Sequence, residues 1–223
     1  MFITKKMPRS LSAESYRSLR TSIKFSSVDK PIKTIVVTSS IMGEGKSTVV
    51  GNLAYTLSQD GAKVLVVDCD LRKPSMHYNF FITNGDGLTD LLIGNSDLKS
   101  VIRKIEDSLF LITAGTIPPN PSEMIGSKGM EYLIDKLKIN FDYIIIDVPP
   151  ILPVTDALLL AAKADATIMV VRARRTKAHM VKESYEKLLE VKANIIGTVL
   201  NACDKSIDNK YYGYYEEKKR KRR

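Results

Sequence analysis

A loop suited to binding nucleotide phosphates lies between an apolar segment and a helix-forming segment, and its residues are Gly43, Glu44, Gly45, Lys46, Ser47 and Thr48. Because the glycines have no Cβ, the backbone can turn tightly and point successive N–H groups at phosphate oxygens. Lys46 would reach the β- and γ-phosphates, the Ser47 hydroxyl would bind Mg²⁺, and Thr48 would contact the α-phosphate. The full pattern begins with a glycine where this chain has Ser40. The Gly-Lys-Ser half still predicts a nucleoside triphosphate site rather than a simple glycine-rich turn.

Carboxylates follow two apolar runs that are expected to be strands of one sheet. Asp147 ends one run and is suited to hold Mg²⁺ through water, although it could instead cap the following turn. Asp68 and Asp70 end another run, and such a pair suggests Mg²⁺ binding together with a base for a hydroxyl proton, or a turn cap. Arg72 could pair with either acid or with a phosphate.

The elements that position these residues form a βα pattern. Short β-branched runs alternate with helical periodicity, which predicts an α/β, P-loop NTPase-like domain with a mostly parallel sheet flanked by helices. Ligands bind at the carboxyl ends of such strands. The expected strands are Thr34–Thr38, Lys63–Asp68, Leu109–Ala114, Tyr143–Asp147, Thr167–Arg172 and Asn194–Asn201. The expected helices are about Leu11 to Phe25, Ser47–Gln59, Pro121–Lys138, Asp156–Ala162 and Lys177–Val191.

Length and composition favour a single domain with a flexible tail. The chain has 223 residues, of which 44% are hydrophobic, and this suffices for one sizeable core. We expect an N-terminal helix region at 1–28, the main domain at 29–203 and a tail at 204–223. No apolar run is long enough for a membrane span and no signal peptide is evident, so a cytosolic location is expected. The two cysteines lie far apart, which argues against a disulfide scaffold or a zinc site.

The tail holds a tyrosine cluster followed by a basic run. The cluster contains four of the ten tyrosines of the chain: Tyr211, Tyr212, Tyr214 and Tyr215. Clustered tyrosines suit an accessible substrate that is modified repeatedly, although a packed aromatic patch is the alternative. Residues 218–223 supply six of the +9 net charges, so the rest of the chain carries +3 and is not a strongly basic surface. The basic run could contact anionic lipid or nucleic acid, or could simply be solvated.

One side of the first expected helix carries a charged row. Glu14, Arg17 and Arg20 recur every three residues, which aligns them on one face. On spacing alone this row is either a set of surface ion pairs or an interface.

Taken together, these segments resemble the bacterial tyrosine kinases of capsule and exopolysaccharide synthesis. The resemblance extends from about Ser12 to the tail, and it rests on several segments in the right order. Those segments are Gly43–Thr48, Asp68–Pro74, Gly87–Asp90, Pro119–Glu123, Tyr143–Pro150 and Gly197–Asn201. In that family the phosphate loop, the paired-aspartate strand and the later aspartate strand are called Walker A, A′ and B.

The resemblance implies an ATP- and Mg²⁺-dependent protein-tyrosine autokinase. It assigns catalysis to Lys46, Asp68, Asp70 and Arg72, and nucleotide binding to the phosphate loop, including Glu44, and to Asn201. It assigns Mg²⁺ to Ser47, Asp147 and one of Asp68 and Asp70, and it favours Asp68 as the base. The tyrosine cluster would be the autophosphorylation site. Glu14, Arg17 and Arg20 would form the contact of a ring-shaped homo-oligomer that delivers one tail to the next site.

The resemblance also implies partners. A separate transmembrane protein would activate the kinase at the inner face of the membrane, a cognate phosphotyrosine phosphatase would reverse the reaction, and no specific nucleic acid is expected. A partitioning or positioning ATPase of the same superfamily is the alternative, but its phosphate loop has an additional lysine near its start that this chain lacks. A non-catalytic, nucleotide-gated scaffold of polymer export is a third possibility.

Overall fold

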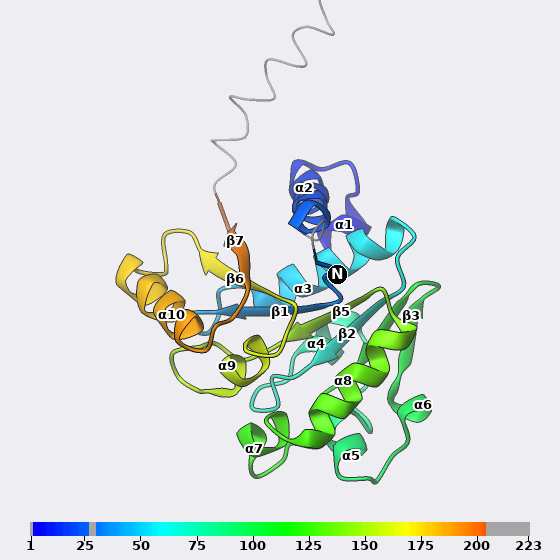
Figure 1. Ribbon diagram of the computed structural model, residues 1–223. Helices are drawn as coiled ribbons and strands as arrows, with labels where there is room; N and C mark the ends of the chain where they lie inside the picture. The colour runs from blue at the N-terminus through cyan, green and yellow to red at the C-terminus, as the bar shows by residue number, and fades with distance from the viewer. Residues whose placement is uncertain (1, 27–29, 204–223) are drawn as a thin grey trace, which may run out of the picture.

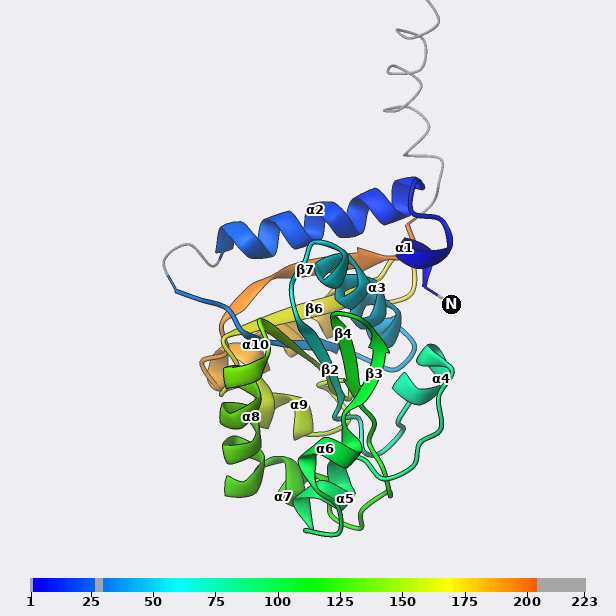
Figure 2. The same ribbon diagram turned by 90° about the vertical axis from the view of Figure 1, so that its right-hand side faces the viewer.

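The computed structural model describes residues 2–26 and 30–203, and a seven-stranded sheet forms its centre (Figures 1 and 2). The strand order is β3-β4-β2-β5-β1-β6-β7, and all neighbouring strands are parallel except β3 and β4. The strands are β1 Thr34–Ser39, β2 Val64–Asp68, β3 Arg103–Glu106, β4 Leu109–Ile112, β5 Tyr143–Asp147, β6 Ala166–Arg172 and β7 Ile195–Asn201. The predicted mostly parallel, P-loop NTPase-like sheet is therefore confirmed.

Helices cover both faces of this sheet (Figure 1). Ile35 and Val37 of β1 pack in the cluster that contains the apolar face of α3, whereas Val36 packs in the cluster beneath α8, α9 and α10. This alternation is the expected consequence of the two-residue period of a strand. The helices are α1 Ile3–Lys6, α2 Leu11–Ser26, α3 Lys46–Gln59, α4 Met76–Phe80, α5 Leu88–Leu92, α6 Leu98–Val101, α7 Pro121–Ile125, α8 Lys128–Asn140, α9 Asp156–Ala161 and α10 Ala178–Glu190.

The N-terminal helix α2 lies outside the βα crossovers, as expected. It buries Ala13 and Ile23 and lies against α3, the helix that follows the phosphate loop. Figure 2 shows α2 along the same side of the molecule as α1, α3 and β7. The N-terminal region therefore contacts the phosphate-loop helix directly.

Several predicted elements need correction. The continuous helix expected over Pro121–Lys138 is wrong, because it breaks at Gly126 and Ser127 into α7 and α8. The Ser127 hydroxyl accepts a hydrogen bond from the Met130 amide at 3.1 Å and so begins α8 as its N-cap. The polar edge strand β3 and the short helices α1, α4, α5 and α6 were not predicted. Elements this short or this polar have no apolar periodicity to reveal them.

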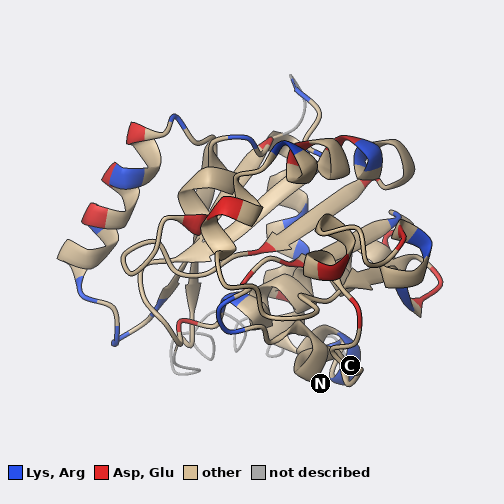
Figure 3. Cartoon of the chain, turned by 90° about the horizontal axis from the view of Figure 1, so that it is seen from below, with Lys and Arg blue, Asp and Glu red and all other residues tan. Residues whose placement is uncertain are grey.

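Charges are mixed over the described part of the chain. Figure 3 shows basic and acidic segments interspersed on its helices and loops. Among the described residues, no helix combines the length and the apolar character that crossing a membrane requires.

Candidate active site

The phosphate loop turns sharply between β1 and α3. Gly43 and Gly45 have φ angles of +79° and +93°, a left-handed conformation that favours glycine. A Cβ on Gly45 would lie 2.0 Å from the Asn201 side-chain nitrogen. Gly45 therefore cannot be replaced without moving Asn201, and Lys46 directly after it is the first residue of α3. The sequence correctly placed both glycines at tight positions.

The Glu44 side chain supports the loop from inside the protein. Its buried carboxylate accepts hydrogen bonds from the Ile41 amide at 2.8 Å and the Arg172 amide at 3.1 Å, and also from the Thr176 hydroxyl. The Asn201 side-chain amide donates to the Glu44 carbonyl at 2.8 Å. The nucleotide-binding role predicted for Glu44 therefore stays a prediction for its place in the loop, since its carboxylate is bound within the protein. The prediction missed Arg172 and Thr176, since nothing near them in the sequence marks them.

Asp68 and Asp147 lie side by side at the carboxyl ends of β2 and β5, where their Cα positions are paired in register. The Ser47 hydroxyl donates to Asp147 Oδ2 at 2.7 Å, and the Ser75 hydroxyl donates to Ser47 Oγ at 2.9 Å. The structure thus joins residues from the phosphate loop and from two strands, as predicted, and adds Ser75. Ser75 was not predicted, because a serine in a loop after a strand carries no sequence signal of its own.

The Asp68 carboxylate is fully buried and held by the backbone. Its Oδ2 accepts from the amides of Ser75 at 3.0 Å and Met76 at 2.9 Å, and its Oδ1 accepts from the Asp70 amide at 3.2 Å. Burial, and next the nearby Asp147 carboxylate, raise the pKa of Asp68 to about 8. Burial likewise raises the pKa of Asp147 to about 7, and the positive charge of Lys46 opposes that rise.

This arrangement fits a bound cation. Asp147 Oδ1 is buried and has no hydrogen-bond partner within the described part of the chain. An unpartnered carboxylate oxygen beside a serine hydroxyl and a second carboxylate supplies the hard oxygen ligands that Mg²⁺ prefers. No three His, Cys, Asp or Glu side chains cluster as a metal site among the described residues. Few protein ligands are expected for Mg²⁺, because phosphate and water oxygens complete its shell.

Arg72 has a different partner from those predicted. Its guanidinium binds both oxygens of the buried Asp156 carboxylate, at 2.9 and 3.1 Å, and it also donates to the Ser122 hydroxyl at 2.9 Å. The acidic partner is therefore Asp156 and neither Asp68 nor Asp70, which corrects that part of the prediction. The bidentate pair ties the loop after β2 to α7 and α9, which is a supporting role.

Asp70 is less buried than Asp68. One of its carboxylate oxygens accepts from the Lys73 amide at 3.0 Å. Burial raises the pKa of Asp70, and the Lys46 charge partly offsets this effect.

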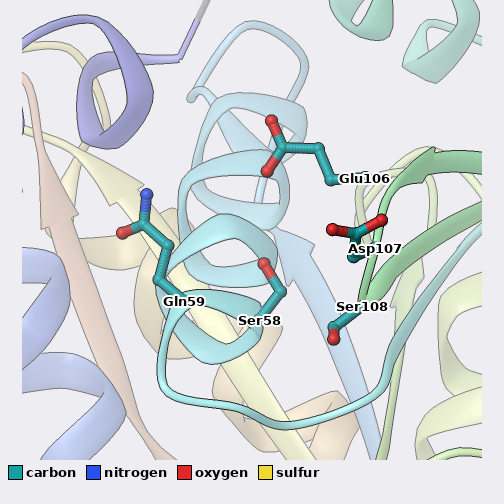
Figure 4. A pocket seen from close by; sticks show the side chains of 5 residues that line it. All are labelled: Ser58, Gln59, Glu106, Asp107 and Ser108. Carbon is teal, nitrogen blue, oxygen red and sulfur yellow. The ribbon is translucent and has the colours of Figure 1, made fainter.

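Two hollows lie near α3. A cavity of about 370 Å³ beside the start of α3 is lined by Thr48 and Asn201 and by residues of α1 and α2. A second hollow, of about 400 Å³, lies at the other end of α3 and is lined by Ser58, Gln59, Glu106, Asp107 and Ser108 (Figure 4). The second has two carboxylates and neither a basic residue nor a glycine loop, so only the first is suited to continue a nucleotide site.

The charged row on α2 divides into two parts. Glu14 pairs with Arg17, which also donates to the Pro8 carbonyl. Arg20 turns toward α3, where it binds Asp60 at 3.2 Å and the Thr56 carbonyl at 3.3 Å. Arg20 therefore has an intramolecular role that the sequence did not reveal.

The predicted acceptor cluster, Tyr211, Tyr212, Tyr214 and Tyr215, lies outside the described residues. Two tyrosines in the described part of the chain, Tyr16 and Tyr78, differ in access. Tyr78 is 74% exposed, whereas Tyr16 lies against α3, and its burial raises its pKa.

Comparison with known proteins agrees with this geometry. The family described as "AAA domain" matches residues 32–200, so the chain is a P-loop, ATP-binding protein. It is 40% identical over 212 residues to the tyrosine-protein kinase YwqD of Bacillus subtilis, covering 95% of this chain and 89% of that protein. It is 36% identical over 211 residues to the putative tyrosine-protein kinase CapB of Staphylococcus aureus, covering 94% and 92%. The solved structure of the chimerical protein CapA2B2 superposes with a TM-score of 0.88 at 38% identity, covering 91% of this chain and 89% of that one.

The chain belongs to the bacterial tyrosine kinases of capsule and exopolysaccharide synthesis. The enzyme is accordingly a protein-tyrosine kinase. This decides against both alternatives weighed from the sequence, the partitioning ATPase and the non-catalytic scaffold.

Proposed function

We propose that this tyrosine autokinase of capsular and exopolysaccharide synthesis transfers the γ-phosphoryl group of ATP, bound with Mg²⁺, to the tyrosine cluster of another copy of the chain. The observation that carries this proposal is the meeting of Lys46 and Ser47 with Asp68 and Asp147 at one edge of the sheet. Phosphoryl transfer needs little covalent chemistry from the protein and depends on positioning and on charge stabilisation. The site offers both.

Each residue has a role in this proposal. The loop amides and Lys46 bind the phosphates and neutralise the charge that develops on the transferred group. Ser47 and Asp147 would hold Mg²⁺, which would supply positive charge to stabilise the phosphoryl group during transfer. Asp68 accepts the proton of the tyrosine hydroxyl, because a raised pKa suits a general base near neutral pH. Asp70 is the alternative base, and it is the more accessible of the two.

Replacing Tyr211, Tyr212, Tyr214 and Tyr215 together with Phe should abolish most self-labelling and leave ATP binding intact. Phenylalanine keeps the rings but removes the nucleophilic hydroxyls. Incubation with labelled ATP and Mg²⁺, followed by phosphoamino-acid analysis, measures the transfer. Tyr78→Phe is the matched control and should label normally. Near-normal labelling of the quadruple variant would contradict the assigned acceptors.

We also propose that α2 contributes to a ring-shaped homo-oligomer. Glu14 and Arg17 support this, because their ion pair lies at the surface, where it can exchange partners with a neighbour. Arg20 remains part of the proposal, but its contact with Asp60 means that changing it also disturbs the monomer. A ring would hold a neighbour's tail near the site at an effective concentration on the order of millimolar.

Arg17→Glu should therefore reduce both assembly and self-phosphorylation. The reversed charge faces Glu14 in the same chain and recurs at every junction of a ring. Light scattering should detect smaller species, with the affinity for ATP unchanged. Lys182→Glu, a charge reversal at an exposed position on α10, is the control. If Arg17→Glu has the same mass as the unmodified protein, the charged row is a set of surface ion pairs and not an interface.

Further partners complete the proposal. A separate transmembrane protein activates the kinase at the inner face of the membrane, which places the enzyme in the cytoplasm as a peripheral protein. The solved CapA2B2 chimera, whose name combines a CapA and a CapB part, supports a two-protein arrangement. A cognate phosphotyrosine phosphatase reverses the modification. The proposal includes no specific nucleic-acid partner, since basic and acidic residues alternate over the described part of the chain (Figure 3).

A further inference from the structure

Residues 2–6, called the arm below, are docked on the phosphate-loop helix. The Phe2 ring is 6% exposed and lies 5.5 Å from the ring of Tyr55 and 4.9 Å from that of Phe80. The ring packs against Gly51 of α3, called its seat below, where a Cβ would lie 2.0 Å from the ring. A glycine in a helix interior is less favourable than alanine, and here it makes room for Phe2. Lys5 adds an ion pair to Glu106, which lines the hollow in Figure 4.

Asn52 connects the arm to the phosphate site. Its buried side-chain oxygen accepts from the Thr4 amide at 3.0 Å and from the Thr4 hydroxyl at 3.1 Å. Its side-chain nitrogen donates to the Thr48 carbonyl at 2.8 Å, on the first turn of α3 beside Ser47. Tyr16 of α2 lines the same cavity as Asn52. One buried amide thus contacts both the arm and the residue expected to bind the α-phosphate.

The arm also forms part of the cavity at the nucleotide site. Phe2 and Ile3 line this cavity of about 370 Å³ together with Thr48 and Asn201. If the arm left its seat, the cavity would lose a wall and Asn52 would lose two of its hydrogen-bond donors. Water would replace these donors at the uncovered Asn52 oxygen, so the side chain would be free to reorient and to give up its hydrogen bond to the Thr48 carbonyl.

We propose that Asn52 is a positioning residue. The docked arm orients Asn52, and Asn52 positions the first turn of α3 at the nucleotide site, so that the affinity for ATP depends on the arm. The proposal rests on the phosphate site described above. It extends that site to residues that touch no phosphate. By linkage, bound nucleotide must also hold the arm more firmly in its seat.

Gly51→Ala tests the proposal without removing a polar group. The added methyl group displaces Phe2, while alanine favours the helix, so the fold should be retained. Asn52→Leu removes the connection itself at similar volume. Each variant should weaken the affinity for a non-hydrolysable ATP analogue about three- to tenfold, since a typical hydrogen bond contributes about 0.5–1.5 kcal/mol. Lys6→Ala, at an exposed position of the same arm, is the control and should bind like the unmodified protein.

Three measurements separate positioning from damage to the fold. Calorimetric titration gives the dissociation constant, and kinetics should show a raised KM for ATP with kcat at saturating ATP changed less than about twofold. The double variant Gly51→Ala/Asn52→Leu should weaken binding by less than the product of the single effects, because both act through the arm. Hydrogen exchange at the Thr4 amide should slow when the analogue binds. If Asn52→Leu does not fold, Gly51→Ala and the exchange experiment decide alone.

Lys46→Met distinguishes failure of this proposal from failure of the phosphate site. Normal affinity in that variant would mean that the phosphate site itself is misassigned. If Lys46→Met loses affinity while Gly51→Ala and a folded Asn52→Leu bind like the unmodified protein, the site stands and the role of Asn52 and the arm is overturned. Exchange at Thr4 that is unaffected by nucleotide would overturn it equally.

Discussion

Replacing Lys46 with Met should reduce phosphotyrosine formation at least about a hundredfold while the fold is retained. Lys46 begins α3 directly after the tight Gly45 turn, and its charge acts on both Asp70 and Asp147. Methionine keeps most of the stem but supplies no charge to a phosphoryl group that becomes more negative along the reaction. Transition-state stabilisation is therefore lost together with part of the affinity for ATP.

The measurement is the initial rate of phosphotyrosine formation at saturating ATP and Mg²⁺, with circular dichroism to verify the fold. Lys99→Met removes the same charge from an exposed position on α6 and should leave the rate unchanged. A folded Lys46→Met protein with an undiminished rate would refute the assigned site.

Asp147→Asn should have two opposite effects: loss of kinase activity and a gain in stability of the ligand-free protein. Activity falls at least about a hundredfold in limiting Mg²⁺, because an amide is a weaker ligand than a carboxylate and carries no charge. Stability rises because the variant no longer places a second buried carboxylate beside Asp68. Active sites commonly sacrifice stability in this way.

The gain should depend on pH. The folded pKa of Asp147 is raised to about 7, above its unfolded value, so its stabilising contribution is present at low pH and is lost as pH rises toward 7. The variant does not titrate at this position. Its melting temperature should match that of the unmodified protein near pH 4. Near pH 8 it should be higher, by about 3 °C or more for each unit by which folding raises the pKa of Asp147.

Melting curves of the ligand-free proteins between pH 4 and pH 8 test this expectation. Asp135→Asn removes one charge from an exposed position on α8 and should change neither activity nor the pH dependence. If Asp147→Asn keeps its rate in limiting Mg²⁺, Asp147 does not bind the metal. If the two melting temperatures stay parallel from pH 4 to pH 8, its carboxyl is not destabilised by burial.

The core of the site was predictable because its determinants are local. Gly43 and Gly45 have positive φ angles that other residues adopt only with strain, so their spacing before Lys46 already specifies the loop. Asp68 and Asp147 each end an apolar run. Parallel strands bring their carboxyl ends to one edge, and the observed register of these two residues follows from that rule.

Other features followed from contacts between distant segments. Arg72 lies two and four residues after the acids with which it was expected to pair, yet its acidic partner is the distant Asp156. Glu44 lies in the phosphate loop, but its buried carboxylate accepts hydrogen bonds from the Arg172 and Ile41 amides. A long charged side chain can reach several partners from one position in the chain, and only the packed fold selects among them.

By itself, then, the sequence determined the class of fold, the phosphate loop and the two aspartate strands, because backbone sterics and the periods of helix and strand act over a few residues. Only the tertiary structure decided which partners Arg20, Arg72 and Glu44 take, and that Phe2 and Thr4 reach Gly51 and Asn52 across nearly fifty positions of the chain. Such contacts depend on which surfaces become adjacent when both faces of the sheet are covered. No local pattern in the chain encodes that adjacency.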